Sequence, residues 1–161
     1  LDVCPGGVND VLAETLGLAE ISVLNPIGQD AAGRPYGLIR TGTVRGQSLA
    51  EFAAFVKAAL GCPGVRFADA GRPVCRVTVG GGSCGSAIDE VLAAGCDTLV
   101  TADLKYNHFE EAKYRGLNLI DAGHFETENP VCALLAAIVR GKLPEVRVLR
   151  SEMHKDETQF L

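Results

Sequence analysis

His124 and Glu128 are the residues of this sequence whose types and spacing best suit metal chemistry. An imidazole and a carboxylate together suit a borderline divalent ion such as zinc, manganese or iron. A spacing of four residues brings both side chains to one side of a helix. Pro130, however, favours the first turn of a helix and disfavours helical geometry at Asn129, which would leave the pair in a tight loop. A surface histidine that merely lies near a carboxylate is the remaining alternative.

Gly80, Gly82 and Gly85 form a G-x-G-x-x-G pattern between an expected strand and an expected helix. In that context, backbone N–H groups and the start of a helix can hold a phosphate, as in dinucleotide-binding loops. The acidic residue that such a loop requires would be Asp103, but it follows the end of another strand. Close backbone packing, or a loop that makes room at the metal-binding edge, is the favoured alternative. Cys84 is expected to be a packed thiol rather than an activated thiolate.

Polar residues also follow the next two expected strands. Asp103 comes after residues 97–101, and Asp121 and His124 come after residues 117–120. Because ligands of open α/β sheets gather beyond the carboxyl ends of the strands, we expect these segments to converge at one edge. His108 lies five residues after Asp103, a spacing that places the two on different sides of a helix.

The elements that must position these residues follow from hydrophobic periodicity and turn residues. Strands are expected at residues 21–24, 38–44, 74–79, 97–101, 117–120 and 146–149, with a loop at 25–36. Helices are expected at residues 6–17, 48–61, from the glycine segment to Gly95, at 104–115 and at 130–140. Ser48 and Glu51 form a capping box. The alternation predicts an α/β fold with a largely parallel sheet and right-handed crossover helices.

The composition is that of one globular α/β domain. The chain has 161 residues, 47% of them hydrophobic, and a net charge of −5. It has no basic surplus for nucleic acid or anionic lipid and no apolar run of the roughly 18 residues that a membrane span needs. Six cysteines without a C-x-x-C pair predict free thiols in a reducing cytoplasm. Because the sequence opens at Leu1 without an initiator Met, we interpret it as part of a longer chain.

Three segments of the sequence carry a family resemblance. They are Leu1-Asp2 with Pro5 to Asp10, Gly81–Gly85 followed by Gly95 to Asp103, and Asp121 to Glu128. In this order they resemble the hexameric dinuclear-metal-centre family, also called the NGG-interacting factor three family and often labelled GTP cyclohydrolase I type 2 homologues. The resemblance implies an α/β fold with two related halves, a toroidal homohexamer and two divalent metal ions in each subunit.

The same resemblance implies which residues hold metal. Asp2 matches the aspartate that bridges the two ions, and His124 and Glu128 match the C-terminal ligands. The other ligands of the family are histidines that precede the position of Asp2, so residues 1–161 are expected to be a single α/β metal-binding domain from the C-terminal portion of a longer member. A family histidine four residues after Asp103 is replaced by Asn107, and His108 is not taken as a ligand.

Three functions remain open at this stage. The first is a metal-dependent hydrolase, similar to GTP cyclohydrolase type 2, that uses zinc, iron or manganese and acts on an anionic or nucleotide small molecule. Its catalytic residues are not assigned. The second is a non-enzymatic oligomeric protein that handles metal or binds a partner. The third is a nucleotide-binding domain that uses the glycine segment 80–85.

Overall fold

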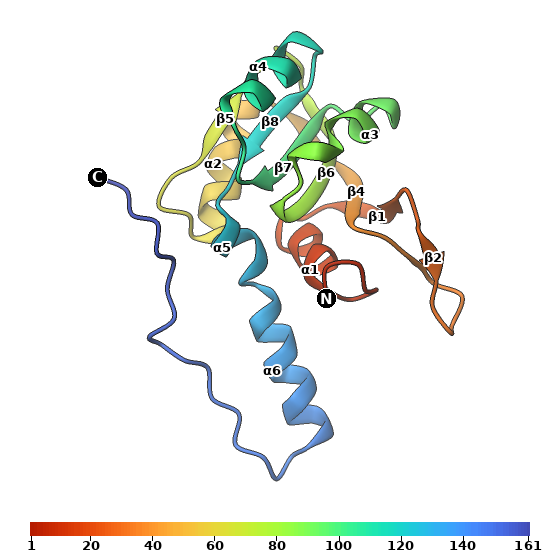
Figure 1. Cartoon of the computed structure of the whole chain (residues 1–161), viewed down its shortest axis with the longest axis vertical. Helices are drawn as coiled ribbons and strands as arrows, with labels where there is room; N and C mark the ends of the chain where they lie inside the picture. Colours follow the sequence, from red (N-terminus) through yellow and green to blue (C-terminus); the bar gives the residue numbers. More distant parts are fainter.

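The main element of the fold is a six-stranded mixed sheet, seen in the computed structural model of residues 1–161 (Figure 1). In spatial order its strands are β1 Ala19–Leu24, β4 Ile39–Gln47, β6 Val74–Ser83, β7 Thr98–Ala102, β8 Asn118–Asp121 and β5 Arg66–Ala68. A small hairpin, β2 Gly28–Gln29 with β3 Pro35–Tyr36, projects from one side (Figure 1). This hairpin lies inside the segment that was expected to be a loop.

The expectation of a largely parallel sheet is wrong. β6, β7 and β8 are parallel, but β4 is antiparallel to both β1 and β6, and β5 is antiparallel to β8. The reason is that helix α2, Leu49–Leu60, carries the chain from β4 to β5 at the far edge, so that β6 re-enters the sheet beside β4 in the opposite direction. All six strands form one sheet, so the two related halves implied by the resemblance are not seen as separate sheets.

Helices cover both faces of this sheet. They are α1 Val8–Thr15, α2, α3 Ile88–Ala93, α4 Tyr106–Tyr114, α5 His124–Glu128 and α6 Val131–Lys142. Successive side chains of a strand point to opposite faces. Accordingly Val100 and Ile120 pack in one core with α1 and α2, whereas Leu99 and Leu119 pack in a second core with α3 and α4. The carboxyl ends of the three parallel strands therefore meet at one rigidly held edge.

The predicted capping box of α2 is confirmed. The Glu51 N–H donates to Ser48 Oγ at 3.3 Å, and the Ser48 N–H donates to the Glu51 carboxylate at 3.0 Å. The helix ends at Gly61, whose left-handed φ of 71° is the usual end of a helix at glycine. Phe52 and Val56 on its inner side are fully buried, whereas Phe55 is 43% exposed.

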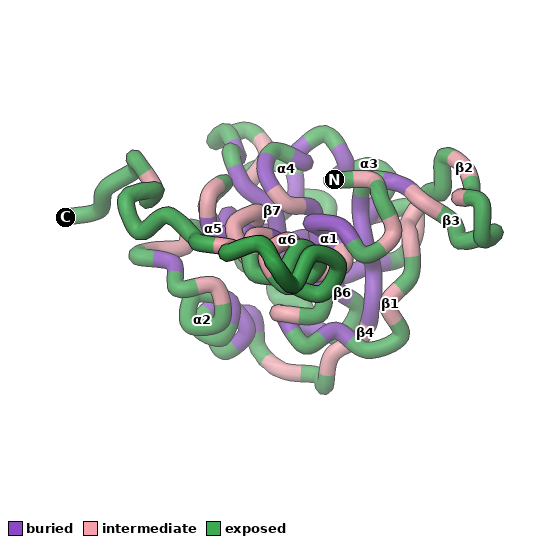
Figure 2. The backbone as a smooth tube through the Cα atoms, turned by 90° about the horizontal axis from the view of Figure 1, so that it is seen from below, coloured by how far each residue is buried: buried purple, intermediate pink, exposed green.

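The C-terminal segment differs from the prediction. Residues 146–149 form no strand, because the segment runs back along α6 and away from both edges of the sheet (Figure 1). The apolar residues of α6 at positions 131, 134, 135, 138 and 139 suggest a buried face, but only Val131 is buried, and Ile138 is 43% exposed. Figure 2 shows that most of α6 is open to solvent. None of the helices is long and apolar enough to span a membrane.

Candidate metal centre

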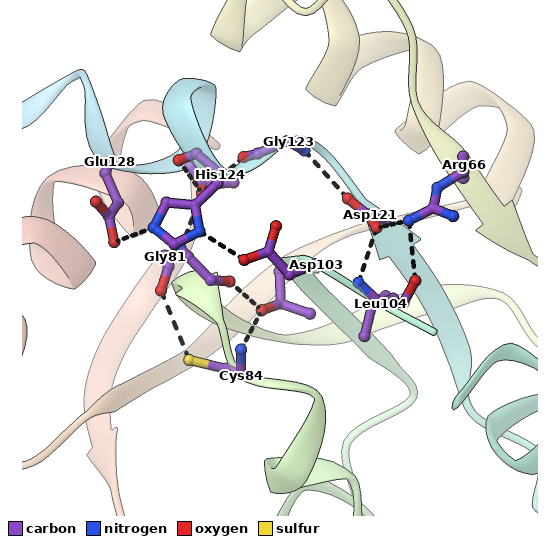
Figure 3. A network of polar contacts seen from close by, with 12 residues as sticks. Arg66, Gly81, Cys84, Asp103, Leu104, Asp121, Gly123, His124 and Glu128 are labelled. Atoms are coloured by element: carbon purple, nitrogen blue, oxygen red, sulfur yellow. Dashed lines mark hydrogen bonds and ion pairs between the residues drawn. The ribbon is translucent and has the colours of Figure 1, made fainter. Parts of the chain in front are cut away.

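His124, Asp103 and Asp121 meet at the edge formed by the parallel strands, as the sequence predicted (Figure 3). Asp121 ends β8, His124 begins α5, and Asp103 directly follows β7. Asp103 adopts a left-handed backbone with φ of 56°, which is uncommon for a residue other than glycine. The convergence of strand ends therefore holds although the sheet as a whole is mixed.

The imidazole of His124 lies between two carboxylates. Its Nδ1 is 2.7 Å from Oδ2 of Asp103, and its Nε2 is 3.2 Å from Oε1 of Glu128 (Figure 3). The hydrogen bond to Asp103 and the nearby Glu128 carboxylate raise the pKa of His124. A histidine that binds metal through one ring nitrogen usually donates from the other to a carboxylate. The arrangement therefore fits an Nε2 ligand whose ring is oriented by Asp103.

The alternative that this pair lies in a loop is wrong. Residues 124–128 form helix α5, so a spacing of four does bring His124 and Glu128 to one side. Asn129 remains helical, with φ of −56° and ψ of −29°, and Pro130 follows it in the same conformation. A residue before proline usually avoids helical geometry. Asn129 nevertheless adopts it, because α5 and α6 follow one another almost directly.

Gly82 is the residue that leaves room for the pair. A Cβ atom at this position would lie 2.6 Å from Oε1 of Glu128 and 3.0 Å from Nε2 of His124, and φ is +63°. Contacts closer than 3.0 Å are not tolerated without movement. The glycine segment therefore makes space at the candidate metal edge, which was the favoured alternative for it.

The same segment does not form a phosphate-binding loop. Residues 80–83 belong to strand β6, and α3 is reached only through a 3-10 turn. The amides of Gly81, Gly82 and Cys84 donate to the side chains of Asn9, Thr127 and Thr101, at 2.6, 3.0 and 3.0 Å. These N–H groups are thus already used within the protein. Cys84 is buried, and burial raises the pKa of its thiol, so it is the packed thiol that we predicted.

Asp2 is held on the same side of the molecule by Asn9. The fully buried amide of Asn9 donates to the backbone oxygen of Asp2 at 2.9 Å and accepts from Gly81 at 2.6 Å. Burial raises the pKa of the Cys84 thiol, and the negative charges of Asp2 and Glu128 raise it further. No group of three or more His, Cys, Asp or Glu side chains is gathered closely enough to hold a metal ion. The donor types fit a divalent metal, but the structure does not join Asp2 to the other two.

Three positioning residues were not identified from the sequence. Asn9 links Asp2 to β6, and Thr127 donates to Gly123 and accepts from Gly82. Arg40, which is 1% exposed, holds Asp10 through two hydrogen bonds of 2.5 and 3.0 Å. Asn9 and Asp10 both lie in the first segment that carries the family resemblance. The sequence therefore pointed to this segment, but it did not reveal which contacts these two side chains make.

The other histidines have separate roles. The Lys105 N–H donates to Nδ1 of His108 at 3.2 Å, so His108 caps the start of α4 and is not part of the His124 pair. The ring of His154, in the C-terminal segment, lies 5.2 Å from the ring of Phe125 in α5. The tail therefore contacts the element that carries the candidate ligands.

A polar cleft of about 300 Å³ lies directly beside His124. One wall is formed by Arg66 of β5, which pairs with the buried Asp121 and donates to the backbone oxygen of Leu104 at 2.9 Å. Glu126 of α5 and Asp156 of the tail also line the cleft. Burial, followed by the negative charge of Asp156, raises the pKa of Glu126.

Comparison with known proteins places these features in context. A family model described as Duf34/NIF3 (NGG1p interacting factor 3) matches residues 1–157. A GTP cyclohydrolase 1 type 2 homolog of Nostoc sp. is 36% identical over 143 residues, which are 86% of this chain and 52% of that protein. The corresponding homolog of Streptomyces coelicolor is 40% identical over 147 residues, which are 84% of this chain and 49% of that protein. The chain thus spans about half the length of these curated relatives.

Solved structures share the fold. The crystal structure of a hypothetical protein of Staphylococcus aureus matches with a TM-score of 0.88 at 27% identity. The match covers 100% of this chain and 66% of that one. The arrangement of strands and helices described above is therefore that of these solved relatives.

Proposed function

This chain belongs to the Duf34/NIF3 family, and from that membership we propose that it binds divalent metal in a dinuclear centre and acts as a metal-dependent hydrolase. The observation that carries the proposal is the His124–Glu128 pair, in which Nε2 faces a carboxylate oxygen at 3.2 Å while Nδ1 is held by Asp103. Curated relatives named GTP cyclohydrolase 1 type 2 homologs support the choice of reaction class.

In this proposal each residue has a defined task. His124 and Glu128 would hold one divalent ion and Asp2 would help to hold a second, with zinc, iron or manganese as the metal. Asp103 keeps the proton of the imidazole on Nδ1, so that the lone pair of Nε2 faces the metal position. Gly82 keeps the space in front of that nitrogen free of a side chain.

The chemistry that a metal held by these residues would supply is Lewis-acid activation of water for hydrolysis. The substrate would enter over the strand ends through the cleft beside His124. Because that cleft carries more carboxylates than cations, an anionic or nucleotide substrate would depend on the positive charge of the ions for its affinity.

The test is the metal content of the full-length protein, with the preceding histidines that the resemblance implies, measured by zinc titration and by elemental analysis. We expect bound divalent metal in the natural sequence and its loss in the double variant His124→Ala, Glu128→Ala. The double variant His108→Ala, Glu110→Ala removes the same two residue types from helix α4, away from the His124–Glu128 pair, and should keep its metal. Absence of metal from the natural chain, or equal metal in both double variants, contradicts the proposal.

A second candidate is a non-enzymatic oligomeric protein, for example a homohexamer, that handles metal or binds a partner. It is favoured by α6, a twelve-residue helix with an apolar composition of which only Val131 is buried. Helices in water generally depend on tertiary packing of their apolar face. Measuring molar mass by light scattering, together with turnover of nucleotide, phosphoester and amide substrates, separates the two. Metal binding and assembly without any turnover would favour this second function.

A further inference from the structure

The side chain of Asp121 joins the ends of the two strands that lead to the candidate site. β7 and β8 lie side by side, and their last backbone hydrogen bond runs from the Ala122 N–H to the oxygen of Thr101, at 2.9 Å. No backbone hydrogen bond links residues 103–104 to residues 122–124. Beyond the ladder, the two strand ends are therefore held together by side chains alone.

The contact between Asp103 and His124 is too exposed to hold these strand ends by itself. Nδ1 of the imidazole lies 2.7 Å from the carboxylate, but both side chains are 51% exposed. Exposed pairs of this kind contribute little to stability, because water screens the charges and two mobile side chains must be ordered. Asp103 also has a left-handed φ of 56°, which a residue with a Cβ atom adopts only at a cost. Another group must therefore fix the backbones that bear this pair.

Asp121 is bonded to both of these backbones (Figure 3). Its carboxylate is only 6% exposed, and it accepts from the Leu104 N–H at 3.0 Å and from the Gly123 N–H at 3.2 Å, one at each oxygen. Leu104 directly follows Asp103, and Gly123 directly precedes His124. One buried carboxylate thus fixes the residue next to each member of the pair.

Arg66 of β5 completes this arrangement. Its Nη2 pairs with the Asp121 carboxylate and also donates to the backbone oxygen of Leu104 at 2.9 Å. The guanidinium lies 5.3 Å from the centre of the Phe109 ring, which supports it from one face. Leu104 is therefore held at its N–H by Asp121 and at its oxygen by Arg66. Hydrogen bonds to a charged carboxylate are stronger than those between neutral groups, which suits this task.

We propose that Asp121 is a positioning residue of the candidate metal centre. It sets the separation of Asp103 and His124, so that the imidazole proton stays on Nδ1 and the lone pair of Nε2 stays available to a metal ion. Asp121 acts through these two residues and does not touch the ion itself. This inference rests on the proposed function, because it takes His124 as a ligand through Nε2.

The test is NMR spectroscopy of the neutral imidazole rings in the full-length protein, labelled with nitrogen-15 and freed of metal with EDTA, above the raised pKa of His124. Long-range proton–nitrogen correlations distinguish the two tautomers, and His124→Gln identifies the His124 signals. We expect Nδ1–H in the natural protein. In Asp121→Asn the Nε2–H form that free histidine prefers should become the major one, because the amide NH₂ cannot accept from a backbone N–H. His108, whose Nδ1 accepts from the Lys105 N–H at 3.2 Å, provides an Nε2–H reference in the same spectrum.

Asp97→Asn is the matched control for this substitution. Asp97 is also 6% exposed and accepts from the N–H groups of Cys75 and Arg76, at 3.1 and 2.7 Å. It precedes β7, at the opposite end of the strand from Asp103. The control therefore removes the same charge and similar hydrogen bonds, and it should lower stability without changing the tautomer of His124. Thermal melts verify that both variants fold.

A measurement on the natural protein keeps the inference testable if Asp121→Asn does not fold. Scalar couplings across the hydrogen bonds, from the Leu104 and Gly123 amide nitrogens to the Asp121 carboxyl carbon, should be detectable. Absence of both couplings, an unchanged His124 tautomer in folded Asp121→Asn, or an equal change in Asp97→Asn overturns the inference.

Zinc titration of the same full-length variants separates this inference from the metal proposal. We expect zinc affinity at least about ten-fold lower in Asp121→Asn than in Asp97→Asn, as for other residues that orient a ligand. Normal zinc binding with an unchanged His124 tautomer in Asp121→Asn overturns the positioning role and leaves the metal proposal standing. A changed tautomer in a protein whose natural form binds no zinc removes the metal proposal and leaves the positioning of His124 by Asp121 standing.

Discussion

Replacing Gly82 with alanine tests the geometry of the candidate metal centre most directly. A Cβ atom would lie 2.6 Å from Oε1 of Glu128, so that carboxylate must retreat by about 1 Å to reach ordinary van der Waals contact. The left-handed φ of +63° adds a backbone cost of about 1–2 kcal/mol for an L-residue. Because Glu128 can swing aside, we expect only this backbone cost in stability, together with a ten- to hundred-fold loss of zinc affinity, roughly the size that disturbed ligand geometry produces.

Gly17→Ala is the matched control for this substitution. Its φ is +67°, and no atom lies within 4 Å of the added Cβ, so it carries the backbone cost without the contact. Urea unfolding should show similar losses for both variants, and a chromophoric chelator should show weakened zinc binding for Gly82→Ala alone. For a chain of this length the melting temperature should fall by about 2–4 °C for each kcal/mol lost. Unchanged zinc affinity in Gly82→Ala would refute the placement of the metal between Glu128 and His124.

Three further predictions concern charge and hydrogen bonding. In the metal-free chain the raised pKa of His124 means that its stabilisation is present below about pH 6.5 and is lost as the pH rises through the folded pKa, so His124→Ala should lower the melting temperature more at pH 5.5 than at 8.5. Since the pKa of Glu126 is also raised, its ionisation opposes folding, and Glu126→Gln should stabilise the chain at about pH 7 but not below about pH 4.5, as thermal melts can check. Asn9→Ala removes a fully buried amide that makes three hydrogen bonds to part-buried backbone groups and should cost about 1–3 kcal/mol in urea unfolding, and a loss of only a few tenths would contradict its role as a clamp.

Most of the fold could be predicted from periodic patterns. Helix α2 was placed within one residue at each end because a capping box and a terminal glycine mark it. Strand β5 was missed since it has only three residues, and its absence from the prediction hid the crossing that makes the sheet mixed. The pattern at residues 146–149 resembled a strand, but a strand also needs a neighbour, which local sequence does not reveal.

The candidate site was predicted only in part, because the sequence shows local spacing but not contacts between distant segments. The approach of His124 and Glu128 follows from their spacing of four residues, because residues 124–128 form a helix. The contact of Asp103 with His124 joins two strand ends, and only their shared edge could be expected from the sequence. The opening of Gly82 toward the pair depends on β6 continuing through the glycine segment, which the G-x-G-x-x-G pattern did not indicate.

The least constrained of the three proposed ligands is Asp2, and the polar residues around it explain how it could be held. Arg40 binds Asp10, whose carboxylate also accepts from the Gly6 N–H at 2.6 Å, so the loop that follows Asp2 is fixed to β4. Asn9 fixes the backbone of Asp2 itself to β6, next to Gly82. These contacts restrain the backbone and leave the Asp2 carboxylate free to rotate. By contrast, the side chains of His124 and Glu128 already face one another.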